Sequence, residues 1–383
     1  MQFKDLQAQY RRYRVEIDAA IKKVLYGANF IGGDEVAELE EHLAEYVGVK
    51  YCITCANGTD AMTLVLMAWD IQAGDAVFVP DFTFFATGEV VPFRGATPVF
   101  VDVDRDTFNI DPLKLEAAIQ KTAAAGKIRP KAVIPVDLFG LPANYPEIEK
   151  IATRYNLVVL EDGAQGMGGN INGKRACSFG HAATTSFFPA KPLGCYGDGG
   201  AIFTNDDALA EVIQSLKVHG KGENKYDNVR IGVNSRLDAL QAAVLKVKLK
   251  AFTEHEFEDV NRIARLYDEK LKGIVETPVI PAGYHSSFAQ YTIKLENKTQ
   301  RDKLQAELKR QGIPSMIYYI KPMHKQKAFA GLQHDGNESA PADAQDFAVT
   351  NELCDIVLSL PMHPYLSEGN VERVCEVASG CLT

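Results

Sequence analysis

The chain has 383 residues, 46% of them hydrophobic, and a formal net charge of −9. It is long enough to bury a large core and to form roughly two domains. The negative charge and the absence of a lysine/arginine block argue against nucleic acid as a partner, because neutralising phosphates needs a concentrated basic surface. The sequence has no apolar signal region and no run that would span a bilayer, so we expect a cytoplasmic protein without a membrane partner.

The cysteine pattern favours reduced thiols. Seven cysteines, an odd number, are widely spaced in a large chain, which is not typical of a disulfide framework. Cys52 and Cys55 have CxxC spacing, but they lie in an apolar run with no second pair at zinc-site spacing and no nearby histidine. We therefore predict no metal site and keep redox or metal use of this pair as the weaker alternative.

The first two-thirds of the chain alternate short apolar runs with longer amphipathic ones. This alternation is typical of strand–helix units that build a mostly parallel sheet, and continuous apolar runs are expected where both faces of a strand are buried. The helix after Asp111 should start with that residue as N-cap and Pro112 at its first position. The predicted strands span 51–55, 76–79, 97–101, 131–135, 157–161, 182–188 and 200–204, and the predicted helices span 59–70, 112–124, 145–155 and 206–219.

A change of pattern divides the chain. From about 235 to 272, apolar residues three to five apart predict one long helix. This helix would lead from a large domain at 1–250 to a smaller α+β domain at 251–383, on which an N-terminal helix could also pack. The smaller domain is predicted to contain a strand at 288–295, a helix at 300–311, a segment at 314–319, a polar loop at 331–341, a helix at 342–354 and a further segment at 356–361.

Lys191 has unusual neighbours for a lysine. It lies between a predicted strand and a glycine cluster, and Phe187, Phe188 and Leu193 would lower the pKa of its amine by excluding water. A neutral amine is a nucleophile, and glycines let another molecule approach the backbone. The segment is typical of a lysine that reacts with a carbonyl compound, although a surface lysine in a loop fits it about equally well.

Other groups would lie at the same edge of the sheet. Gly58 and Thr59 open a helix after a strand, where N–H groups suit a phosphate or simply a capped helix start. Asp162 ends an apolar strand and could pair with a protonated ring nitrogen or a structural arginine. An aromatic of the run 82–85 could stack on a flat ligand or pack in the core, and Ser186 could donate to a phosphate. Together with a reactive lysine, these groups are the set that pyridoxal phosphate requires.

Four segments resemble the DegT/DnrJ-type nucleotide-sugar aminotransferases: 161–165, 186–194, 196–200 and 234–243. The resemblance covers nearly the whole chain and is strongest to enzymes that aminate C-3 of a UDP-linked 3-keto N-acetylated sugar, typically a glucuronate, for lipopolysaccharide O-antigen or other surface polysaccharide. It implies an α/β protein of PLP-dependent fold type I, with a large domain around a mostly parallel sheet and a smaller C-terminal α+β domain.

The resemblance also implies roles for single residues. Lys191 matches the lysine that holds pyridoxal 5′-phosphate (PLP) as an internal aldimine and later moves a proton. Asp162 matches the acid that keeps the ring nitrogen protonated. Asn234 matches a phosphate ligand supplied by the neighbouring subunit, so a homodimer with shared active sites is implied. The remaining matches are Phe84 as the stacking aromatic, Gln165 at the ring hydroxyl, and Gly58, Thr59 and Ser186 at the phosphate.

The implied reaction has two stages, in which glutamate donates its nitrogen and a UDP-linked ketosugar accepts it. Glutamate and a uronate both carry a carboxylate, and Arg236 is the candidate that binds them, with a helix-terminal salt bridge as its alternative role. The relatives that use a glucuronate are expected to have His-Tyr where this chain has Tyr318-Tyr319. The sugar is therefore a uronate, held through Arg236, Lys321 or His324, or a neutral 3-keto or 4-keto N-acetylhexosamine nucleotide.

Other classes of function are less consistent with the sequence. Glycines at 194, 197, 199 and 200 could indicate a nucleotide-dependent oxidoreductase, but a dinucleotide fingerprint opens a helix, whereas these glycines precede a predicted strand. By the resemblance, a sugar 3-dehydratase would have histidine in place of Lys191. A non-catalytic regulator would not retain every expected catalytic residue. A 4-keto-6-deoxy nucleotide-sugar aminotransferase remains an alternative.

Overall fold

A seven-stranded sheet forms the centre of the computed structural model, which describes residues 1–224, 226–332 and 347–382. The strand order is β1-β9-β8-β5-β4-β2-β3. Strands β3, β2, β4, β5 and β8 run parallel, whereas β9 is antiparallel to both of its neighbours. The α/β class with a mostly parallel sheet is thereby confirmed. The strands are β1 (Tyr51–Cys55), β2 (Asp75–Pro80), β3 (Thr97–Val101), β4 (Arg129–Val133), β5 (Val158–Asp162), β8 (Ala182–Ser186) and β9 (Gly200–Thr204).

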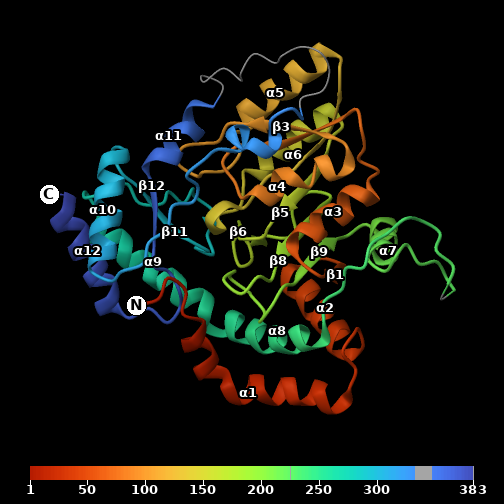
Figure 1. Cartoon of the computed structure of the whole chain (residues 1–383), viewed down its shortest axis with the longest axis horizontal. Helices are drawn as coiled ribbons and strands as arrows, with labels where there is room; N and C mark the ends of the chain where they lie inside the picture. The colour runs from red at the N-terminus through yellow and green to blue at the C-terminus, as the bar shows by residue number, and fades with distance from the viewer. Residues whose placement is uncertain (225, 333–346, 383) are drawn as a thin grey trace.

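Helices cover both faces of this sheet (Figure 1). One face packs against α3 (Gly58–Ala68) and α7 (Asp207–Leu216). The other packs against α2 (Asp34–Val47) and α8 (Ala239–Ala251) at one end and α5 (Pro112–Ala125) and α6 (Tyr145–Tyr155) at the other. Alternate strand residues enter alternate cores, and for this reason Cys52 and Cys55 lie on opposite faces of β1 and cannot act as a pair. All seven cysteines are free and buried.

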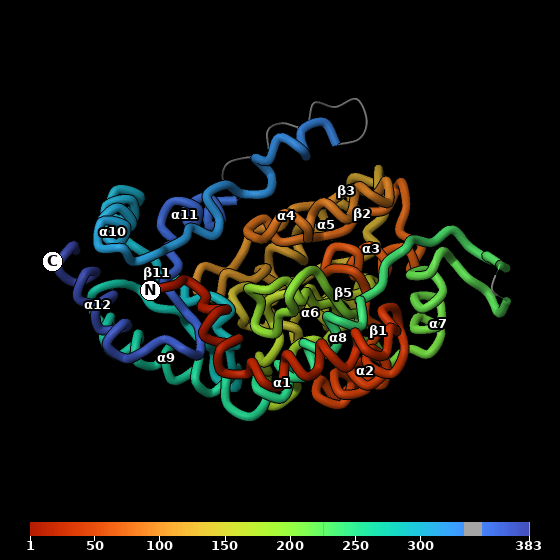
Figure 2. The backbone as a smooth tube through the Cα atoms, turned by 60° about the horizontal axis from the view of Figure 1, so that its bottom comes forward, coloured from red at the N-terminus to blue at the C-terminus, as the bar shows by residue number. Residues whose placement is uncertain are grey.

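A second hydrophobic core follows α8. It joins α9 (Phe257–Leu271), α10 (Lys298–Arg310) and α12 (Glu368–Leu382) to the strand pair β11 (Tyr291–Lys294) and β12 (Val357–Leu360). Helix α1 (Leu6–Gly27) lies along α8, while Met1 packs against the second core (Figures 1 and 2). The division of the chain at residue 250 stays a prediction. Among the described residues, no helix is both long and apolar enough to cross a membrane.

Several predicted elements differ from those observed. The long helix predicted at 235–272 is two helices joined by a π-helical turn, Phe252–Glu256. The strand predicted at 182–188 ends at Ser186, and the segment 314–319 contributes only a bridge between Met316 and Ser359. Part of the predicted helix 342–354 is observed as α11 (Ala348–Ile356). Residues 342–346 of that helix, and residues 333–341 of the predicted polar loop, lie outside the described residues. The remaining elements are α4 (Phe85–Glu89), β6 (Asn170–Ile171), β7 (Lys174–Arg175), β10 (Tyr284–His285) and short 3₁₀ turns.

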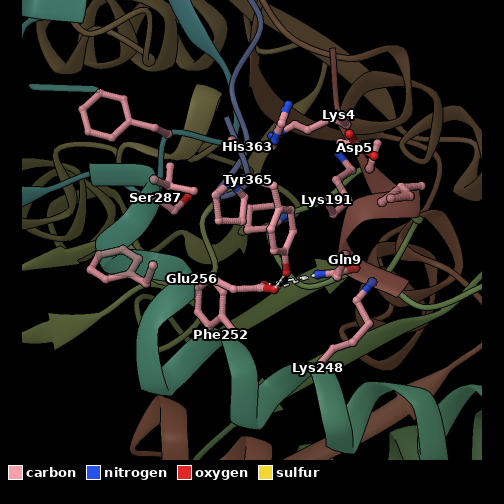
Figure 3. Close-up of a pocket in the computed structure, with 18 of the residues that line it drawn as sticks. Lys4, Asp5, Gln9, Lys191, Lys248, Phe252, Glu256, Ser287, His363 and Tyr365 are labelled. Atoms are coloured by element: carbon pink, nitrogen blue, oxygen red, sulfur yellow. Dashed lines mark hydrogen bonds between the residues drawn. The ribbon is translucent and has the colours of Figure 1, made fainter. Parts of the chain in front are cut away.

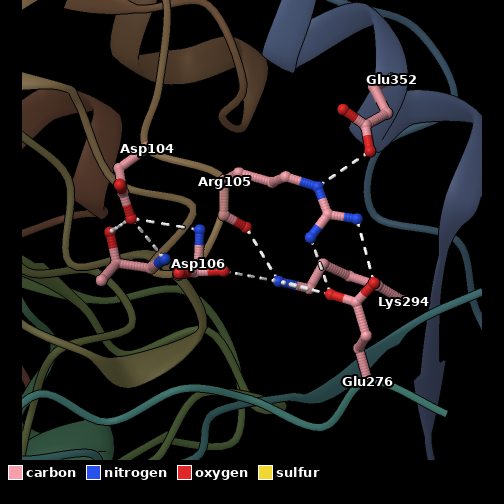
Figure 4. A network of polar contacts seen from close by, with 7 residues as sticks. Asp104, Arg105, Asp106, Glu276, Lys294 and Glu352 are labelled. Atoms are coloured by element: carbon pink, nitrogen blue, oxygen red, sulfur yellow. Dashed lines mark hydrogen bonds and ion pairs between the residues drawn. The ribbon is translucent and has the colours of Figure 1, made fainter.

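Polar contacts fix the second core against the strand ends of the sheet (Figure 4). Arg105, which follows β3, pairs with Glu276 at 2.7 Å and with Glu352 of α11 at 2.8 Å. The side chain of Lys294 in β11 is buried and pairs with Asp106 at 3.2 Å. Because β3 ends just before Arg105, these contacts fix the second core to the carboxyl edge of the sheet.

Candidate active site

Lys191 follows β8, at the edge where the parallel strands end. Its backbone N–H donates to the Phe188 carbonyl at 2.9 Å, closing a turn. Burial lowers the pKa of its amine, and the charge of Asp162 acts in the opposite direction. Phe187 and Leu193 are buried as predicted, but Phe188 is 52% exposed. Two of the three apolar side chains predicted around this amine are therefore buried.

Side chains of α8 bind the loop that carries Lys191. The ammonium of Lys248 donates to the Gly194 carbonyl, and Gln241 accepts from the backbone N–H of Tyr196 at 2.8 Å. A Cβ on Gly194 would lie 2.5 Å from the Phe188 carbonyl oxygen, so only glycine fits there. Lys248 is buried, which lowers its pKa to about 8. These contacts fix the backbone on either side of the reactive side chain.

Asp162 ends β5 and is 4% exposed. It accepts a hydrogen bond from the Thr87 hydroxyl at 2.7 Å and one from the Ala164 N–H at 3.2 Å. Burial raises the pKa of this carboxyl group, whereas Thr87, Ala164 and the Lys191 charge lower it. No arginine pairs with Asp162 in the described part of the chain, which removes the structural alternative.

The adjacent acid has a different environment. Glu161 accepts from the N–H groups of Cys177 and Phe179, the latter at 2.7 Å, and is fully buried. Desolvation and the nearby Asp137 raise its pKa well above the usual range. Glu161 therefore supports the loop after β7, and only Asp162 is directed to the site.

The start of α3 and the end of β8 touch each other. A Cβ on Gly58 would lie 2.9 Å from the Cβ of Ser186, so this contact requires glycine. Asn57 caps the helix by accepting from the Asp60 N–H at 2.8 Å. The N–H groups of Gly58 and Thr59 have no acceptor within the described residues, as a phosphate site at a helix start requires.

Three more of the predicted residues lie at this edge. Phe84 caps α4 and is 56% exposed, so it does not pack in the core. Gln165 is buried; its carbonyl accepts from the Phe139 N–H at 2.7 Å, and its amide reaches the Tyr319 hydroxyl at 3.4 Å. Tyr319 lies edge-on to Phe82, with ring centroids 5.8 Å apart. Burial and the Asp162 charge raise the pKa of Tyr319, so it stays protonated.

Asn234, Arg236 and His324 do not line the pocket beside Lys191 in the described part of the single chain. Asn234 and Arg236 are exposed on either side of the buried Ser235, which donates to Asp60 at 2.6 Å. His324 is bound through Nδ1 to the buried Asp81 at 2.6 Å, so only its Nε2 is left for a ligand.

Tyr318 packs against the N-terminal segment. Its ring lies edge-on to Phe3, with centroids 6.3 Å apart, and it also contacts the ring of Tyr319. It is only partly buried.

Sequence reasoning missed several residues around Lys191. Thr87, Lys248, Lys4 and His363 come from four separate parts of the chain, and no local pattern distinguishes them. Figure 3 shows Lys4, Lys191 and His363 close together beside a cavity of about 50 Å³. Thr87 could have been suspected, because it follows the aromatic run at the end of β2.

The described residues fit PLP. The site combines an open helix start for a phosphate, a buried carboxylate for a ring nitrogen, an exposed aromatic side chain and an amine with a lowered pKa. These groups converge on the carboxyl ends of β5 and β8, where open α/β sheets bind ligands.

Known proteins resemble the chain over its whole length. It is 46% identical to UDP-2-acetamido-2-deoxy-3-oxo-D-glucuronate aminotransferase of Pseudomonas aeruginosa, with 98% of each chain covered. It is 41% identical to UDP-N-acetyl-3-dehydro-α-D-glucosamine 3-aminotransferase of Acidithiobacillus ferrooxidans, with 97% of this chain and 95% of that one covered.

Solved structures agree with these relatives. The crystal structure of a DegT/DnrJ/EryC1/StrS aminotransferase from Brucella abortus is 52% identical and superposes with a TM-score of 0.94, covering 100% of this chain and 99% of that one. NtdA from Bacillus subtilis, solved with bound cofactor PMP, is 29% identical with a TM-score of 0.85 over 97% of this chain and 82% of that one. The cofactor of this chain is accordingly PLP, and the chain is an aminotransferase. The family model described as the DegT/DnrJ/EryC1/StrS aminotransferase family matches residues 12–378, and the chain belongs to this family.

Proposed function

We propose that this chain transfers an amino group from glutamate to C-3 of a UDP-linked 3-keto N-acetylated sugar, a glucuronate or a hexosamine, for surface polysaccharide. The main support is a partly buried amine, Lys191, whose charge interacts with that of a buried carboxylate, Asp162, at the PLP site. The names of the two relatives, both acting on UDP-linked 3-oxo or 3-dehydro sugars, support the substrate class. A cytoplasmic location stays a prediction.

The reaction assigns a different task to each of the two central residues. Bound PLP supplies an electron-accepting ring conjugated with the nitrogen that is transferred. Asp162, oriented by Thr87, holds a proton at the ring nitrogen. Lys191 Nζ, whose pKa is lowered by burial, would accept and return the proton at the carbon that bears the transferred nitrogen.

The remaining residues position the reactants. Gly58, Thr59 and Ser186 bind the phosphate, Phe84 stacks on the ring, and Gln165 contacts the ring hydroxyl. Tyr319, held by Gln165, and Tyr318 face the sugar. Arg236 binds a substrate carboxylate. His324 stays a candidate sugar contact through Nε2 only, because Asp81 occupies its other ring nitrogen.

Asn234 and Arg236 complete the site of a second copy in a homodimer. Both are exposed, and they follow a segment that extends from the body next to α7 (Figure 2). The same segment exposes Val229 and Ile231, the latter to 89%, which favours burial against another chain.

Mixed dimers test this arrangement. Lys191→Ala and Asn234→Ala homodimers should each be defective, because every site lacks one essential group. After subunit exchange, a mixed dimer has one intact site, so the mixture should regain roughly a quarter of the wild-type activity if subunits pair at random. Exchange is followed with two differently tagged chains. No recovery despite proven exchange would show that the site is built from one chain.

The change at Tyr318 tests the sugar preference. Tyr318→His should raise the ratio of kcat/KM for the 3-keto glucuronate over the neutral 3-keto hexosamine about tenfold, because one charge-assisted hydrogen bond is worth at least about 1.4 kcal/mol. Tyr318→Phe is the control, since it removes the hydroxyl without adding a charge, and should leave the ratio within about threefold. A ratio that Tyr318→His does not change would remove this position from sugar selection.

A further inference from the structure

The N-terminal segment is fixed across the pocket beside Lys191. The Phe3 carbonyl accepts from the Met362 N–H at 3.3 Å, and Asp5 caps α1 by accepting from the Ala8 N–H at 2.8 Å. One turn later, the Gln9 amide donates to Glu256 at 3.2 Å. These contacts hold the intervening Lys4 in place, and Figure 3 shows its side chain beside Lys191.

Lys4 is a cation without a counterion. Among the described residues it forms neither a hydrogen bond nor an ion pair, and the two acids that line the pocket are engaged elsewhere. Asp5 caps α1, and Glu256 accepts from Gln9 and from the Tyr365 hydroxyl. Burial and the neighbouring Lys191 lower the pKa of Lys4 to about 8, so most molecules keep this charge at neutral pH. A charge that is partly withdrawn from water and has no partner favours binding of an anion.

His363 adds an independent observation. Its side chain lines the same pocket and is only 5% exposed, yet neither ring nitrogen has a hydrogen-bond partner of good geometry, although the backbone of Gln2 lies near. Burial and Lys4 lower its pKa to about 4, so the ring is neutral and offers one N–H donor. Buried polar groups are almost always paired, so an unpaired one at a pocket indicates a missing ligand.

We propose that Lys4 and His363 form a receptor for a carboxylate of the substrate next to Lys191. The inference rests on the proposed function, which supplies two carboxylates, that of glutamate and that of the uronate. The cavity of about 50 Å³ has room for such a group, because one water needs only about 10–15 Å³ by the same measure. Lys4 thereby determines specificity for a substrate carboxylate. Arg236, which is exposed in the single chain, binds a different carboxylate.

Binding of glutarate to the holoenzyme tests the receptor without turnover. Glutarate has the two carboxylates of glutamate but no amino group, so it cannot react. By calorimetry, Lys4→Met should weaken glutarate binding about tenfold or more, since a charge-assisted contact is lost, whereas Lys4→Arg should stay within about threefold of wild type. Lys22→Met, which removes an exposed lysine of α1, is the matched control and should bind as wild type does. Wild-type binding of glutarate by Lys4→Met would overturn the proposal.

Steady-state kinetics distinguish the two carboxylates. If Lys4 receives the donor, Lys4→Met raises KM for glutamate about tenfold with either sugar; if it receives the uronate, only KM for the 3-keto glucuronate rises, and the neutral hexosamine is unaffected. Either result supports the receptor, and unchanged KM values for both would overturn it. Should the wild-type enzyme aminate no ketosugar, the proposed function fails, while the glutarate titration still reports on Lys4.

Discussion

Lys191→Ala is expected to lower kcat by at least about 1,000-fold. In the proposed function, Lys191 Nζ both forms the bond to the cofactor and moves the proton, and loss of a general acid–base group alone costs about 10²–10⁴-fold. The chain should still fold, because the loop is fixed by Lys248 and Gln241 and not by the Lys191 side chain. Rates are measured with glutamate and the 3-keto glucuronate, and folding is checked by circular dichroism.

The control is Lys22→Ala, which removes an exposed lysine from α1 and should leave kcat unchanged. Turnover by Lys191→Ala within about tenfold of wild type would exclude this lysine from the chemistry.

Asp162→Asn is expected to lower kcat by about 10²–10⁴-fold. Asparagine has almost the same shape and can still accept from Thr87, but it has no negative charge to hold a proton at the ring nitrogen. Because the hydrogen bond is kept, the free energy of unfolding should change by less than about 2 kcal/mol. Both quantities are measured on the same preparation, kcat by the coupled formation of 2-oxoglutarate and stability by urea denaturation.

Glu161→Gln provides the matched control, one residue away in the same strand. Glu161 accepts two backbone N–H groups and faces away from the site, so its loss should cost about 1–3 kcal/mol of stability and leave kcat within about threefold. If Glu161→Gln lowered kcat as much as Asp162→Asn, the assignment of the two acids would be wrong.

The central sheet could be predicted because its strands are buried on both faces. Continuous apolar runs gave the bounds of β1, β3 and β9 as observed, and the Asp111 cap of α5 is present, with its carboxylate accepting from Leu113 and Lys114. The π-helical turn Phe252–Glu256 could not be predicted, because its residues keep helical spacing.

The site was only partly predictable, because some of its residues meet only in the folded chain. Residues close to Lys191 in a motif, such as Ser186, were within reach of sequence patterns, and the resemblance supplied roles for others. Lys4 and His363 come from opposite ends of the chain and meet only because the Phe3 backbone pairs with Met362. Which of two adjacent acids faces the site also depends on strand alternation at the end of β5, which the sequence alone leaves open.

Transfer of labelled nitrogen is the most direct test of the proposed reaction. The purified enzyme with PLP is incubated with ¹⁵N-glutamate and the UDP-linked 3-keto glucuronate or 3-keto N-acetylglucosamine, and the sugar is analysed by mass spectrometry. We predict a UDP-linked 3-amino sugar that carries ¹⁵N, formed together with 2-oxoglutarate and absent with Lys191→Ala. A sugar fraction without ¹⁵N for every ketosugar tested, from an enzyme that holds PLP, would contradict the proposed function.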